Sequence, residues 1–101
     1  MSDSRERVRQ AQRLLSQGAP DRAAALAGEV LAEEPDNLEA SYALAVARRH
    51  QHRWTEALDT LAGVLRERPS FGRAHQEVGY NRIAMRDFAG AGTAFERAVN
   101  N

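Results

Sequence analysis

Three histidines are the side chains best able to hold a metal or move a proton in this sequence. Two of them, His50 and His52, stand only two positions apart, and His75 is distant from both. Metal ligands on a helix favour a spacing of three or four positions, which places them on one face. We therefore interpret His50 and His52 as exposed polar residues near the C-terminal end of a helix, where the helix dipole favours them. The sequence contains no cysteine, which excludes disulfides, thiolate catalysis and cysteine-based zinc sites.

Residues 48–53 form a locally basic run that could contact phosphate. The whole chain, however, balances 14 basic against 14 acidic residues, and no aromatic stacking platform accompanies the run, which disfavours nucleic-acid binding. Residues 90–92 are not a phosphate loop, because no strand precedes them and no lysine follows. No serine, histidine and acid set can be proposed, and a thin stack of helices does not readily enclose a water-excluding pocket. The sequence thus predicts a protein that is not an enzyme and holds no metal or cofactor.

A fixed period of about 34 residues organises the chain. Shifting the sequence by this period aligns proline with proline and small residues with small residues. The aligned sets are Pro35 with Pro69; Ala23 with Ala57 and Ala91; Ala11 with Ala45 and Gly79; and Pro20 with Trp54 and Phe88. Three copies follow, at approximately residues 4–37, 38–71 and 72–101, the last ending before its closing proline.

Each copy is predicted to form two helices. In the second helix of the middle copy, apolar residues recur at offsets that share one helical face: Trp54, Ala57, Leu58, Leu61, Val64 and Leu65. No alternating β-branched run occurs, so the predicted fold class is all-α. Prolines mark the helix ends, with Pro20 at a first helical position. Asp36 paired with Glu39, then Ser70, and then Asp87 are expected to cap the helices that follow them.

This pattern resembles the tetratricopeptide repeat, a helix–turn–helix of the same period with small residues where its helices touch. The middle copy matches best, at Leu44, Ala45, Ala57, Leu61, Val64 and Pro69. The resemblance implies three tandem helical hairpins, stacked as a short right-handed α-solenoid in one domain over residues 1–101. The sequence departs from the family where an aromatic residue usually stands early in the first helix, because Arg7, Ser41 and His75 occupy that position.

The resemblance also implies a binding role, with the first helices lining a concave groove that takes a peptide or protein partner. The residues expected on the inner face are Arg5, Arg9, Gln12, Tyr42, Val46, Arg49, His50, Arg73, Gln76 and Tyr80. Arginine pairs with carboxylates and tyrosine supplies rigid contact area, a mixture typical of peptide-binding surfaces. The alternative is that these arginines are merely solvated and that Tyr42 and Tyr80 pack locally.

One narrower function within the family is excluded. Members that clamp the acidic C-terminal tails of heat-shock chaperones carry Lys, Asn, Asn, Lys and Arg at set groove positions. Those positions hold Val8, Gln12, Ala43, Arg73 and Glu77 in this sequence. Because only Arg73 keeps the charge and Glu77 reverses it, the chain does not carry this carboxylate clamp.

The last copy has no polar capping helix after it, which a terminal repeat needs to cover its apolar face. Gly90 and Gly92 each cost about 1 kcal/mol relative to alanine within a helix, and Phe95 and Val99 lie on faces that a further element could cover. Two alternatives to a simple scaffold follow. The chain is either the accessory N-terminal region of a larger enzyme, such as a bacterial sulfotransferase that residues 69–77 resemble weakly, or it self-associates through this repeat.

The N-terminal residues and the composition bear on the source and compartment of the protein. A polar stretch follows Met1, so no signal peptide is recognisable, and no segment is long and apolar enough to span a bilayer. These features predict a cytoplasmic protein. All basic residues are arginine and alanine is abundant, which is typical of a bacterium with GC-rich genes.

Overall fold

The computed structural model describes residues 3–100, and this part of the chain folds into helices without any strand. The helices are α1 (Ser4–Ser16), α2 (Pro20–Glu33), α3 (Leu38–His50), α4 (Trp54–Glu67), α5 (Gly72–Ala84) and α6 (Phe88–Asn100). The first helices begin at residues 4, 38 and 72, and the second helices at residues 20, 54 and 88. Both series advance by the period found in the sequence, so the predicted all-α fold of three hairpins is confirmed. No helix among the described residues is long and apolar enough to cross a membrane.

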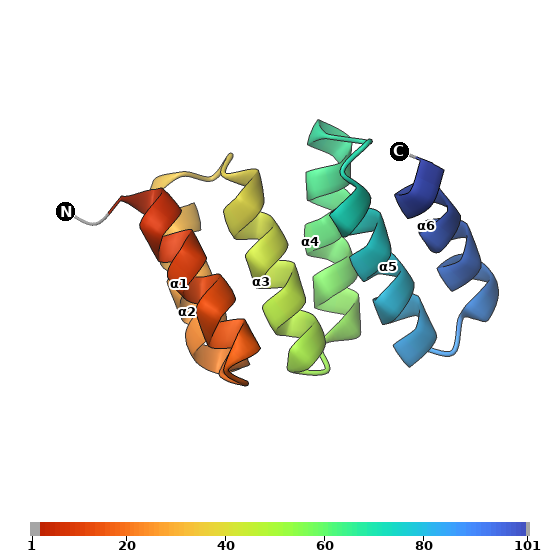
Figure 1. Ribbon diagram of the computed structural model, residues 1–101, viewed down its shortest axis with the longest axis horizontal. Helices are drawn as coiled ribbons and strands as arrows, with labels where there is room; N and C mark the ends of the chain where they lie inside the picture. The colour runs from red at the N-terminus through yellow and green to blue at the C-terminus, as the bar shows by residue number, and fades with distance from the viewer. Residues whose placement is uncertain (1–2, 101) are drawn as a thin grey trace.

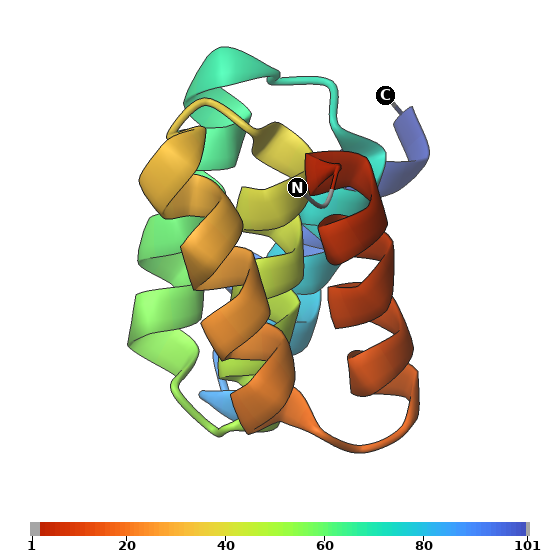
Figure 2. The same ribbon diagram turned by 90° about the vertical axis from the view of Figure 1, so that its left-hand side faces the viewer.

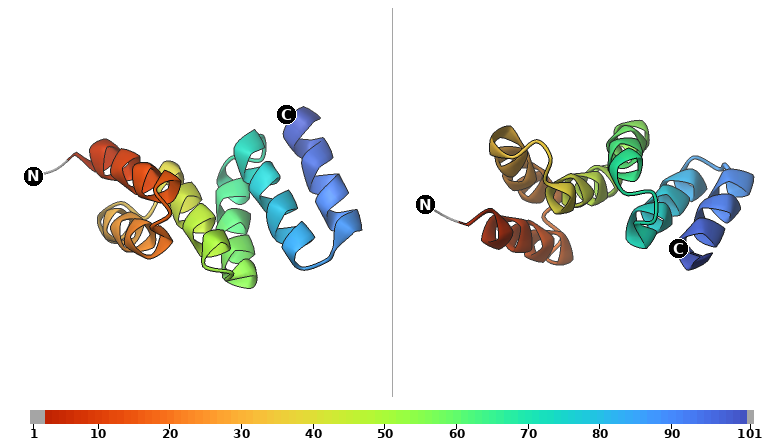
Figure 3. Two further views of the ribbon diagram at one scale, coloured as in Figure 1. Left: turned by 60° about the horizontal axis from the view of Figure 1, so that its bottom comes forward. Right: turned by 90° about the horizontal axis from the view of Figure 1, so that it is seen from above.

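The hairpins stack in a row with a molecular envelope of 44 × 25 × 18 Å. The first helices α1, α3 and α5 are neighbours along the row, and α1 and α6 lie at its two ends (Figure 1). A second layer stands behind them, in which α2 packs against α1 and α3, and α4 packs against α3 and α5 (Figure 2). Helix α6 packs against α5 at the end of the row (Figure 3).

Small side chains hold the helices of each hairpin close together. Ala11, Ala23 and Ala27 are fully buried where α1 meets α2, and Ala45 and Ala57 are equally buried in the second hairpin. Larger residues fill the space between hairpins. One cluster joins α3, α4 and α5 and consists of Ala45, Leu61, Val64, Phe71 and Ala74, with Tyr42, Leu65 and Val78 packed against it. The aligned alanines of the sequence period are therefore buried between the helices of their hairpins.

The turn inside each hairpin has the same backbone conformation three times. Gly18, His52 and Arg86 occupy equivalent positions of the three copies and have φ values of 76°, 62° and 63°. At each turn the following amide donates to a carbonyl five residues earlier, at 2.8 Å for Ala19 to Leu14, for Arg53 to Arg48 and for Asp87 to Arg82. This is the Schellman ending, for which glycine is the favoured residue. The non-glycine residues at two of the three turns each accept a strain of about 1–2 kcal/mol.

Two of the three predicted caps are wrong. Asn37, rather than Asp36, caps α3, since its Oδ1 accepts from the Ala40 amide at 3.0 Å. Helix α5 follows Phe71 and has no side-chain cap, so Ser70 does not serve it. The prediction for α6 is confirmed, because Asp87 Oδ1 accepts from the Gly90 amide at 2.9 Å.

Candidate functional site

The residues predicted to form the groove all lie on the three first helices. Helix α1 carries Arg5, Arg9 and Gln12; α3 carries Tyr42, Val46, Arg49 and His50; and α5 carries Arg73, Gln76 and Tyr80. We call the surface formed by the outward side chains of α1, α3 and α5 the first-helix face. The structure places seven of the predicted residues in a hollow, an aromatic centre or an ion pair with its stacked ring, and Val46, His50 and Gln76 in none of these.

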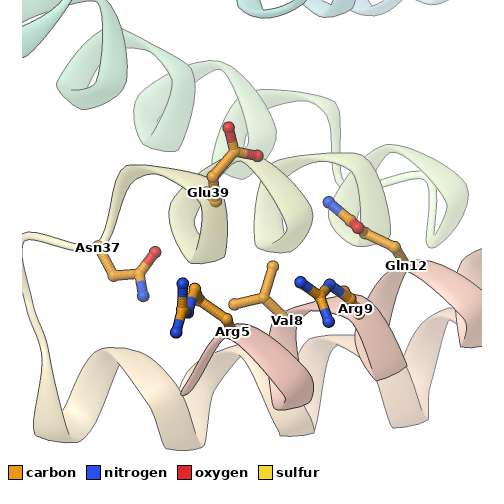
Figure 4. A pocket seen from close by; sticks show the side chains of 6 residues that line it. All are labelled: Arg5, Val8, Arg9, Gln12, Asn37 and Glu39. Atoms are coloured by element: carbon orange, nitrogen blue, oxygen red, sulfur yellow. The ribbon is translucent and has the colours of Figure 1, made fainter. Parts of the chain in front are cut away.

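The hollow lies between α1 and the beginning of α3 and has a volume of about 510 Å³, including space open to solvent. Arg5 and Arg9 flank it on α1, with Val8 between them (Figure 4). Asn37, the residue before α3, and Glu39 of α3 line its other side, and the Glu39 carboxylate is turned away from the two arginines (Figure 4). Gln12 completes the lining. Sequence reasoning found the two arginines and Gln12 but missed the other residues, because the helix register across the hairpin boundary decides which α3 side chains face α1.

The aromatic centre joins α3 to α5. The rings of Tyr42 and Phe71 stack with their centroids 5.4 Å apart. The Arg73 guanidinium lies over both rings, 5.0 Å from the Tyr42 centroid and 4.9 Å from that of Phe71. It also donates to Glu39 Oε1 at 2.9 Å. Burial of the ring raises the pKa of the Tyr42 hydroxyl, and the negative charge of Glu77 raises it further.

Arg49 forms an ion pair inside the fold. Its Nε and Nη2 donate to the two carboxylate oxygens of Glu77, at 2.7 Å and 3.1 Å. The Glu77 side chain is only 6% exposed. The Arg49 guanidinium also lies 4.9 Å from the Tyr80 ring centroid, and Tyr80 in turn meets Phe95 edge to face at 5.6 Å. Since a buried carboxylate left without its partner is costly, Arg49 and Glu77 together fasten α3 to α5.

The family is shown by a match to a model of the tetratricopeptide repeat, which covers residues 14–77. The chain belongs to the tetratricopeptide repeat family. The matched residues run from the end of α1 into α5 and include the best-conforming middle hairpin. No curated protein matches the chain, and the resemblance of residues 69–77 to sulfotransferases gains no support from the comparisons.

Solved structures with the same fold include the one named MamA MSR-1 C2, with a TM-score of 0.82 and 23% sequence identity over 97% of this chain. The structure named MamA RS-1 ArsTM double mutant also has a TM-score of 0.82, with 18% identity over 96% of this chain. The chain spans 56% and 55% of the lengths of these two structures, respectively. At this level of identity the likeness establishes the fold alone.

This tetratricopeptide array offers no constellation for metal binding among its described residues, where no three His, Asp or Glu side chains gather. The histidines are dispersed. His52 stacks on Trp54 at 5.0 Å, and the Nε2 atom of the buried His75 lies 2.7 Å from the Pro69 carbonyl oxygen. Partial burial lowers the pKa of His50, and the charge of Arg49 lowers it further. The tetratricopeptide fold is typical of non-catalytic interaction modules.

Proposed function

We propose that the chain is a non-catalytic scaffold that binds an extended segment of a partner protein across its first-helix face. The observation that carries this proposal is the set of contacts around Arg73. Its guanidinium is fixed by Tyr42, Phe71 and Glu39, yet its side chain remains 54% exposed where α3 and α5 meet. A side chain already held in place loses little conformational entropy when a partner binds, so its contacts are well suited to recognition.

The proposal distributes different roles among the predicted groove residues. Arg73 and Gln76 are exposed on α5 and are available to a partner. Tyr42 and Arg49 also serve the fold, since Tyr42 packs on the core cluster and Arg49 holds the buried Glu77. Loss of binding after a change at either of those two positions would therefore not separate recognition from stability.

The experiment is a selection of binding peptides from a display library of random sequences on the folded chain. We expect selected peptides to lose affinity at least about tenfold when Arg73 and Gln76 are both changed to Ala, because a charged anchor and a polar contact are removed. The matched control changes Arg66 and Thr55, two exposed residues of α4 in the second layer, to Ala, which removes the same charge and one polar side chain. Peptides that bind both double variants equally well, or a selection that returns no peptide, would contradict the proposal.

A second candidate function is self-association through the last hairpin. Val99 is 84% exposed and Phe88 is 64% exposed, unlike their equivalents in the earlier hairpins, Leu65 and Trp54. The other end of the stack is polar, because Arg13 donates to both Glu6 and Gln10 on α1. Because the polar first end cannot cover the apolar last end, two copies would pair through their last hairpins. We call this arrangement tail to tail. Nothing in residues 3–100 favours the alternative of an accessory region of an enzyme.

Light scattering coupled to size exclusion tests this second candidate. A tail-to-tail pair has a mass that rises with concentration to twice that of the chain, and Val99→Glu should return it to a monomer, because a charge would enter the apolar contact. The exposed Ala62→Glu is the matched control. A constant monomer mass for the unaltered chain at every concentration would exclude self-association.

A further inference from the structure

The hollow between α1 and α3 carries positive charge that its own side chains neutralise weakly. We propose that it binds the carboxylate of an acidic side chain in the partner segment, held between the guanidinium groups of Arg5 and Arg9. This inference rests on the proposed function and specifies the chemistry of the partner.

The repeat register leaves Arg5 with a weak ion pair. Arg5, Glu39 and Arg73 occupy equivalent positions of the three copies, so their charges alternate along the face. Glu39 pairs with Arg73 at 2.9 Å. The contact of Arg5 is with Asp3, at 3.5 Å between Nε and Oδ2, and the Arg5 side chain is 81% exposed. Asp3 also accepts the backbone amide of Arg5 as the cap of α1, which engages its other oxygen.

Arg9 is in a similar position one helical turn further along α1. Its Nη1 lies 3.5 Å from Glu6 Oε2, and both side chains are more than half exposed. The other oxygen of Glu6 accepts from Arg13 at 3.1 Å. Exposed ion pairs of this length contribute little to stability, so a partner carboxylate can replace them at small loss. Residues four apart on a helix share one face, and both arginines therefore reach the same hollow.

The remaining lining suits a carboxylate on an apolar stem. Val8 is buried between the two arginines and provides an apolar floor (Figure 4). The Gln12 side-chain amide makes no hydrogen bond with any of residues 3–100, so it can donate to the same ligand. Glu39, on the opposite wall, partly offsets the two positive charges. Arg5, Arg9 and Glu39 give this lining a net charge of +1, which a single carboxylate balances and a phosphate dianion exceeds.

The distribution of charge over the two layers favours the same partner. The first helices α1, α3 and α5 carry eight arginines and three acidic residues, while α2, α4 and α6 carry three arginines and seven acidic residues. The three first helices thus carry a net charge of +5 and the three second helices a net charge of −4, with Arg7 and Arg48 paired across the two layers to Glu33 and Glu56. Such a field steers an acidic segment to the first-helix face.

The test uses a short fluorescent peptide of alternating alanine and glutamate, followed by anisotropy, with an alanine–glutamine peptide as its neutral counterpart. We expect the acidic peptide to bind the folded chain and the neutral one to bind at least about tenfold more weakly. Changing Arg5 and Arg9 to Gln should weaken the acidic peptide by a similar factor and leave the neutral peptide unaffected. Raising the salt concentration should weaken only the binding that depends on these charges.

The matched control removes two arginines from the opposite layer, Arg22→Gln with Arg66→Gln, which changes the net charge by the same amount. Equal loss of binding in both double variants would mean attraction by net charge alone and would overturn the inference, as would absence of binding by the acidic peptide. The display selection separates this failure from that of the proposed function. Selected peptides that need Arg73 and Gln76 but are indifferent to Arg5 and Arg9 would leave the scaffold function standing without the carboxylate site.

Discussion

Replacing Ala57 with Arg is expected to abolish the cooperative unfolding transition of this chain. Ala57 lies on α4 with no exposed surface, at one of the small-residue positions where the helices of a hairpin touch. An arginine there would have to force the helices apart or bury a charge without a partner. Buried unpaired charges cost about 3–5 kcal/mol, which reaches the lower end of the stability of a domain of this size, about 5–15 kcal/mol, before the cost of separating the two helices is added. Urea denaturation followed by circular dichroism at the helix minimum measures the loss.

The control is Ala62→Arg, five positions later on the same helix, where the alanine is exposed. This variant has the same change in charge and nearly the same change in helix propensity, so its transition should stay within about 0.5 kcal/mol of the unaltered chain. If the two variants unfold at the same urea concentration, close contact at Ala57 does not hold the hairpin together.

The sequence period predicted most of the fold because each hairpin repeats the same pattern of helix-ending and small residues. Proline and glycine residues marked the ends of the helices. The aligned alanines identified where α3 meets α4 and where α1 meets α2. The capping predictions for α3 and α5 were wrong, since several polar or turn-forming residues stand together before each helix. Asp36 and Asn37 are adjacent, and the backbone of the turn, which the pattern does not specify, decides which of them caps α3.

The first-helix face could be predicted only in part. The resemblance to the tetratricopeptide repeat assigned the ten expected residues to the first helices, where they lie, but it did not reveal the partners of their side chains. The Arg49–Glu77 pair joins residues 28 positions apart, a separation that is not the repeat period. The Arg73–Glu39 pair could have been inferred, because opposite charges at equivalent positions of successive repeats stack against each other. A residue of this face can pack against its neighbours and still be exposed to solvent. Tyr80 contacts Arg49 and Phe95 and remains 37% exposed.

Alanine substitutions at two glycines of the third hairpin are expected to change stability in opposite directions. A Cβ at Gly79 would lie closer than 3.0 Å to three ring atoms of Phe95, so the ring must move. Overpacking of this kind costs about 1–3 kcal/mol, more than the gain of about 1 kcal/mol from replacing a helical glycine. Gly92 has no atom within 4 Å of an added Cβ, so Gly92→Ala should stabilise the chain by about 1 kcal/mol. The urea concentration at the midpoint of unfolding, measured for each variant, shows whether the substitution raises or lowers the stability.

The repeat itself supplies a rescue for Gly79→Ala. Positions 79 and 95 are equivalent to positions 45 and 61 of the second hairpin, where Ala45 and the fully buried Leu61 share one core cluster. The third hairpin thus pairs a smaller residue on α5 with a larger one on α6. Changing Gly79 to Ala and Phe95 to Leu together recreates the pair of the second hairpin, and we expect the double variant to recover most of the lost stability. A coupling energy near zero in this double-mutant cycle would mean that the glycine is not there to admit the Phe95 ring.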